Sequence, residues 1–299
     1  MSPWSIGPSA SSLSPGYLIR LIGYATDKLV ALQISCGPQS RLVRARVVLE
    51  AFQRDPKRSR HDAVVLGEAV RTAIEFHLIA RTVGGVKPPV HPLLRTALER
   101  ALTGSLDPRK ESNPIARNTQ FELSVGAYLL AGGISFAIGE PDLIAHIGDE
   151  AVGVAAKRVT SRRKIIHRAK AAVAQIEKTG IRGIVALNLD AFVGEVSHGV
   201  AAEAAGESFT AALPEIELLH EILRGNPAVR GLILRGTKVS IAQHDSERAA
   251  KPPASVELTT YDTFHLYAED PNDAIATDAI LKDFESVQRE RLGAVMRSA

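Results

Sequence analysis

Three short apolar runs lie close together in the middle of the chain, at residues 134–138, 143–147 and 151–156. They are separated by Gly-Glu-Pro at 139–141 and by Gly-Asp-Glu at 148–150, which are residue types typical of tight turns. Apolar runs of this length between turn signals predict β-strands. The centre of the chain is therefore expected to fold as a meander of three strands.

Helical and strand-like segments alternate on both sides of this meander. A helix is predicted at about 116–131 before it and a second at about 162–178 after it, ending at Gly180, since glycine commonly terminates helices. Strand-like runs follow at 183–189 and 229–234, with a looser helical stretch between them. Alternation of this kind predicts an α/β fold in which helices cover both faces of a mixed sheet.

The rest of the chain differs in composition. Residues 1–16 are rich in Ser, Pro and Gly and are expected to be disordered, whereas residues 17–114 show mainly helical periodicity. A polar, proline-containing stretch at about 106–114 suits a domain boundary. Within the helical region, helices are predicted at 17–33, 40–54, 61–83 and 91–103. The α/β core is predicted over 115–240, and a linker with a C-terminal strand (259–267) and helix (272–292) over 241–299.

Composition excludes several classes of function. No apolar run approaches the ~18 residues that cross a bilayer, and the N-terminus lacks the basic start and apolar stretch of a signal peptide. A cytoplasmic protein without membrane partners is therefore expected. The single cysteine, Cys36, excludes an internal disulfide, and no histidine pair has zinc-site spacing. The net charge of +3 permits a polyanionic partner.

Four residues stand in an order typical of one kind of catalytic site. Glu122 lies on the helix before the meander, Asp142 follows Pro141 at a turn, Lys157 ends the third strand, and Gln175 lies on the next helix. This order, over about 115–190, resembles the PD-(D/E)xK nuclease superfamily.

The resemblance implies a restriction-endonuclease-like core and a site that holds Mg²⁺, with Mn²⁺ as an alternative. Asp142 and Glu122 would bind the metal, Lys157 would support the attacking water, and Gln175 would orient groups near the site. The chemistry suits these residue types, because hard divalent cations take oxygen ligands and make a bound water more acidic.

One position departs from the family's pattern. The acid expected two residues before Lys157 is Ala155, whose methyl group has no ligand atom. Glu177 on the following helix is one substitute, and the backbone carbonyl of Ala156, acting with Glu122 and Asp142, is another. A third alternative is a degenerate fold that binds nucleic acid without cutting it.

Three of these four residues also have a purely structural explanation. Glu122 completes a capping box that begins at Thr119. Asp142 suits a tight turn, and Lys157 could extend from a strand end into solvent.

A basic stretch follows the third strand. Residues 151–176 contain seven Lys or Arg side chains and no acid. Those predicted to contact a phosphate backbone are Arg158, Arg162, Arg163, Lys164 and Arg168. This bias favours a phosphate-bearing partner such as nucleic acid, and the resemblance implies DNA more than RNA. The structural alternative is a solvated helix face.

Three hypotheses follow from the sequence. The first is a Mg²⁺-dependent nuclease acting on DNA phosphodiester bonds. The second keeps the nuclease fold but makes it a non-catalytic nucleic-acid-binding protein, because Ala155 removes a ligand. The third is a protein-interaction adaptor that works through the helical region. The oligomeric state stays open, with a homodimer as one alternative.

Overall fold

A computed structural model of the chain describes residues 4–56, 62–83, 86, 88–111, 113–131, 133–147, 149–191, 213, 215–241 and 255–267. Contacts divide the chain into two compact units. The helical unit comprises residues 10–124 and 238–259, and the α/β unit comprises 1–9, 125–237 and 260–299. Among the described residues, no helix has both the length and the apolar character to span a membrane.

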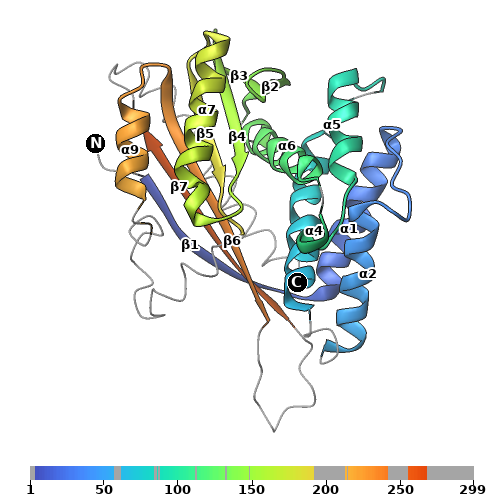
Figure 1. Cartoon of the computed structure of the whole chain (residues 1–299). Coiled ribbons are helices and arrows are strands. Elements are labelled where there is room, and N and C mark those ends of the chain that lie inside the picture. Colours follow the sequence, from blue (N-terminus) through green and yellow to red (C-terminus); the bar gives the residue numbers. More distant parts are fainter. Residues whose placement is uncertain are drawn as a thin grey trace. The chain divides into compact units, whose positions relative to one another are not determined.

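The helical unit is built on helices whose starts are encoded locally. Its elements are α1 (Pro15–Ala31), α2 (Arg41–Arg54), α4 (Ala63–Val83), α5 (Pro92–Leu102), the 3₁₀ turn η2 (Pro108–Lys110) and the first part of α6 (Ile115–Ala131). Ser14 and Ser40 cap α1 and α2, each accepting a backbone N–H bond through its side chain. Helices α1, α2 and α4 pack against one another (Figure 1), around fully buried Leu18, Phe52 and Phe76.

Buried ionic groups cross-link this unit. Arg117 on α6 is 3% exposed, and its guanidinium donates to the carboxylates of Glu68 and Glu111 and to the carbonyls of Ser105 and Leu106. One arginine thus joins α6 to α4 and to the segment before η2.

A second arginine extends the same set of contacts. Arg41 on α2 donates from Nη1 to Gln120 Oε1 at 2.6 Å and also lies 3.8 Å from Glu68. The Gln120 amide in turn donates to Glu75 on α4. Since buried charges are tolerated only when paired and hydrogen-bonded, these contacts fix the helices in one arrangement.

The α/β unit contains the predicted mixed sheet. Its strands are β2 (Ser135–Ile138), β3 (Leu143–Ile147), β4 (Glu150–Arg158), β5 (Gly183–Asn188) and β6 (Val229–Ile241), and β7 (Val256–Leu266) and β1 (Trp4–Leu13) continue the order to β1-β7-β6-β5-β4-β3-β2. Strands β2, β3 and β4 pair antiparallel, and β4, β5 and β6 pair parallel. The α/β class and the meander are therefore confirmed.

Helices cover both faces of this sheet. Helices α7 (Ile165–Thr179) and α9 (Ile216–Arg224) share one apolar cluster with β4, β5 and β6 (Figure 1). On the opposite face, Arg235 of β6 stacks over the ring of Tyr128 on α6 at 4.3 Å. All residues of β5 are buried, as expected of a central strand in a parallel sheet.

Some boundaries differ from the sequence predictions. The expectation of disorder over residues 1–16 is wrong for Trp4–Leu13, which form β1 beside β7. Strand β6 continues to Ile241 and β7 begins at Val256, inside the region expected to be a linker. Pairing along a sheet satisfies the backbone of polar segments whose own composition carries no strand signal. The helix predicted at 272–292 lies outside the described residues.

Gly183 occupies a position where strands β4 and β5 approach too closely for a side chain. A Cβ atom added there would lie 2.5 Å from the carbonyl oxygen of Gly153, its partner in the parallel register, and 3.1 Å from Ile176. We expect Gly183→Ala to lower the free energy of unfolding by about 1–3 kcal/mol, because the backbone itself must shift. Urea denaturation checks this. Gly180→Ala is an unsuitable control because Gly180 has a φ of +68°, whereas Gly37→Ala meets no atom within 4 Å and should cost much less.

Candidate functional site

The antiparallel register of β3 and β4 brings Asp142 beside the end of β4. Leu143 pairs with Val154, so Asp142, one residue earlier, lies next to the segment that contains Lys157. Asp142 Oδ2 accepts a bond from the backbone N–H of Ala156 at 2.8 Å and from Lys157 Nζ at 2.6 Å. Two residues predicted from their order in the sequence are thus in direct contact.

Helix α7 supplies a third side chain to the same carboxylate. Its buried residues, among them Ala172 and Ile176, pack on the sheet, which leaves half-buried Gln175 at the border of that face. Gln175 Nε2 lies 3.0 Å from Asp142 Oδ1 and 3.1 Å from Glu140 Oε2. We refer to Glu140, Asp142, Lys157, Gln175 and the Ala156 N–H as the Asp142 cluster.

The environment of Asp142 is shielded but not closed. The side chains of Asp142 and Lys157 are 14% and 19% exposed. Burial raises the pKa of the Asp142 carboxyl above its ordinary value, and this effect outweighs the opposing influence of Lys157 and the Ala156 N–H. The nearby Glu140 carboxylate raises the same pKa further. The cluster therefore holds a carboxylate whose negative charge is costly, which is typical of sites that bind a cation or transfer a proton.

This raised pKa has a measurable consequence for stability. Between the pKa of Asp142 in the unfolded chain and its higher pKa in the fold, the folded state binds more protons, so its stability falls as pH rises through that interval. We expect the unfolding free energy of wild type minus that of Asp142→Asn to be largest in acid, to decrease as pH rises, and then to level off. Urea denaturation from about pH 3 to about pH 7 measures the difference. If this difference in unfolding free energy instead increased with pH, the effect of Lys157 on the pKa of Asp142 would outweigh the effect of burial.

The structure brings together three of the four predicted site residues. Asp142, Lys157 and Gln175 converge. Glu122 is half-buried on the part of α6 that belongs to the helical unit, so its place beside Asp142 stays a prediction.

The two substitutes considered for the missing acid have other contacts. Glu177 is exposed and accepts a hydrogen bond from Asn226 Nδ2 at 2.7 Å. It lies two residues after Gln175 on α7, and residues at this spacing point to different sides of a helix. Glu177 is therefore held away from Asp142. Ala156 donates its backbone N–H to Asp142, and a metal-binding role of its carbonyl stays a prediction. Glu140 was missed because a Gly-Glu-Pro-Asp turn explains it fully. The available signal was its position directly before the Pro-Asp pair.

The basic residues divide into paired and exposed groups. Arg162 Nε lies 2.8 Å from Glu215, an acid that comes from far along the chain, so the acid-free stretch of sequence is not acid-free in space. Arg163 and Lys164 are exposed on the 3₁₀ turn η3 (Arg162–Lys164) that precedes α7. Arg158 and Arg168 are half-buried. The exposed positive charge thus concentrates at the start of α7.

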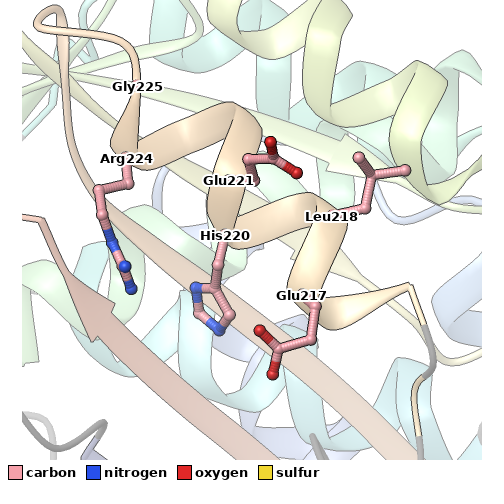
Figure 2. Close-up of a pocket in the computed structure, with 6 residues that line it drawn as sticks. All are labelled: Glu217, Leu218, His220, Glu221, Arg224 and Gly225. Carbon is pink, nitrogen blue, oxygen red and sulfur yellow. The ribbon is translucent and has the colours of Figure 1, made fainter.

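A separate polar hollow of about 450 Å³ lies along α9. Figure 2 shows Glu217, His220 and Arg224 pointing to the same side of this helix. His220 Nδ1 lies 2.6 Å from the hydroxyl of Tyr267, and burial lowers the pKa of His220 and raises that of Tyr267. The lining residues of this hollow include none of the Asp142 cluster.

The donor set of the Asp142 cluster limits how a metal would be held. Within the described ranges, no group of three or more His, Cys, Asp or Glu side chains is arranged to bind a metal ion. A hard cation there would rely on two carboxylates, from Asp142 and Glu140, with neutral oxygen donors or water completing its shell. Mg²⁺ commonly binds in this way, through one or two carboxylates and several waters.

Comparisons with known proteins add no relative from which a role could be transferred to this cluster. No protein-family model, no curated protein and no solved structure matches the chain.

Proposed function

We propose that the chain is a metal-dependent nuclease that hydrolyses DNA phosphodiester bonds. The observation that carries this proposal is the convergence of Lys157 and Gln175 on the carboxylate of Asp142, whose side chain is 14% exposed. Asp142 directly precedes β3, Lys157 lies on β4 and Gln175 lies on α7. These elements follow α6 and β2 in the order expected for a restriction-endonuclease-like core. A chance match of short motifs would not require their side chains to meet.

Each residue has a defined task in this proposal. Asp142, with Glu140 beside it, would hold Mg²⁺ or Mn²⁺, and such an ion, when bound, supplies Lewis-acid stabilisation of charge on the phosphate. Lys157 would orient the attacking water and stabilise the developing negative charge. Gln175 would keep the two carboxylates in position. The exposed Arg163 and Lys164 would contact the phosphate backbone, where charge neutralisation provides affinity.

Cleavage of supercoiled plasmid DNA tests the proposal. The wild-type protein is expected to cut in Mg²⁺ or Mn²⁺ and to stop when the ion is chelated. Lys157→Ala is expected to cut about 10²-fold more slowly or worse, since loss of a group that moves or orients protons costs this much. Lys170→Ala, which removes an exposed lysine from α7, is the matched control and should cut normally. Equal cutting by both variants, or no cutting by wild type with either ion, would exclude catalysis at this cluster.

One observation favours a non-catalytic alternative. Ala155 is fully buried and belongs to the apolar cluster beneath α7, so the position that carries an acid in the family's pattern is used here for packing. DNA binding that weakens with added salt, without cleavage in either ion, would favour this alternative. If the protein neither binds nor cleaves DNA, an adaptor role for the helical unit is favoured.

A further inference from the structure

Position 155 leaves a chemical gap in the proposed site. A nuclease of the proposed kind needs a carboxylate beside Asp142 in addition to the predicted Glu122, but Ala155 offers only a methyl group and has no exposed surface. Glu177, a substitute on α7, is bonded to Asn226. A second carboxylate must therefore come from another part of the chain.

Glu140 already lies where a second ligand is needed. Its Oε2 and Asp142 Oδ1 both contact the same atom, Gln175 Nε2, at 3.1 and 3.0 Å. An amide N–H₂ carries partial positive charge and two protons, so it can bridge two carboxylates. A donor between two negative groups occupies the position that a cation would favour most.

The two oxygens of Asp142 are used differently. Oδ2 is turned toward Lys157 and the Ala156 N–H, whereas Oδ1 is turned toward Gln175 and thus toward Glu140. The Asp142 carboxylate therefore contacts Lys157 through one oxygen and, through the other, the Gln175 amide that also contacts Glu140.

We infer that Glu140 supplies, together with Asp142, the carboxylate pair that binds the divalent cation, in place of the acid missing at Ala155. This inference rests on the proposed nuclease function. Glu140 is then a metal-ligating residue, and Gln175 is a positioning residue that holds the pair together until the ion arrives. Because Glu140 is exposed, its side chain can turn toward an ion without disturbing the core.

Binding of Mn²⁺ alone to the full-length chain tests the inference without relying on activity. We expect saturable binding of one Mn²⁺ by wild type, followed by calorimetry and by the electron paramagnetic resonance of free Mn²⁺. Glu140→Gln is expected to weaken binding at least about tenfold, and Glu140→Asp, which keeps the carboxylate, to weaken it less. Glu177→Gln removes the same charge from a neighbouring exposed glutamate and should bind as wild type does.

The outcomes separate this inference from the proposed function. Wild-type affinity in Glu140→Gln would overturn the role of Glu140, even if wild type cuts DNA. Loss of Mn²⁺ binding in Glu140→Gln, in a protein that never cuts DNA, would support the metal site and reject the nuclease. Absence of Mn²⁺ binding by wild type would overturn the inference outright. Unchanged thermal unfolding of Glu140→Gln, expected for an exposed residue, excludes misfolding as the cause of any loss.

Discussion

Replacing Asp142 with asparagine is expected to slow DNA cleavage by about 10³-fold or more. Asp142 contacts both Lys157 and Gln175, so its charge organises the whole cluster. Loss of metal-assisted charge stabilisation costs several kcal/mol in the transition state, and each ~1.4 kcal/mol is a factor of ten in rate. Single-turnover cleavage of a labelled duplex at saturating protein measures this loss without interference from DNA affinity.

The asparagine variant is chosen because it preserves shape. Asparagine keeps one oxygen that can accept the Ala156 N–H bond, so the fold should survive and only the charge is lost. Asp149→Asn is the matched control, because Asp149 is an exposed acid in the turn between β3 and β4. A normal rate in Asp142→Asn, or an equal loss in Asp149→Asn, would show that this carboxylate does not carry catalysis.

The largest expected effect on stability lies in the helical unit, at Arg117. We expect Arg117→Met to lower the free energy of unfolding by about 3–5 kcal/mol, the usual cost of breaking a buried ion pair by removing one partner. The methionine fills part of the volume, but Glu68 and Glu111, whose side chains are 11% and 8% exposed, each lose a guanidinium partner. Arg71 and Arg41 still lie beside Glu68. The carbonyls of Ser105 and Leu106 lose their donor as well.

An exposed arginine on α2 provides the comparison for Arg117. Arg46 pairs with Glu50 one turn away, and their side chains are 53% and 38% exposed. Arg46→Met should change the unfolding free energy by no more than about 0.5 kcal/mol, because exposed pairs of this spacing contribute little. Urea denaturation of both variants measures the two losses of unfolding free energy, which can then be compared. A loss below about 1 kcal/mol in Arg117→Met would mean that the buried contacts merely offset their desolvation.

The elements that could be predicted are those with strong local signals. Turn residues on both sides of 143–147 and the apolar run at 184–187 indicated strands β3 and β5. Gly180 marked the end of α7, and the helix predicted at 40–54 corresponds to α2. Each signal depends on a backbone preference or a hydrophobic period within a few residues, so it is readable without knowing what the segment packs against.

Other features depend on partners far along the chain. Strand β1 has a Ser- and Pro-rich sequence typical of a loop, and its strand conformation comes from its place beside β7. Arg162 was predicted to be available for phosphate, but Glu215 pairs with it across 53 residues of sequence. No local pattern reports a contact at such a separation.

The sequence alone determined the α/β class, through the central meander and the helices and strands that alternate around it, and the order in which Asp142, Lys157 and Gln175 occur. The positions of these residues relative to the predicted strands and helix can be read from local sequence patterns, without knowledge of the packed structure. The tertiary structure decided that these three side chains meet, that Glu140 joins them through Gln175, and that Glu177 does not. The physical reason is that strand register and the rotation of α7 on the sheet are set by burial of the shared apolar core, which is a property of the packed chain.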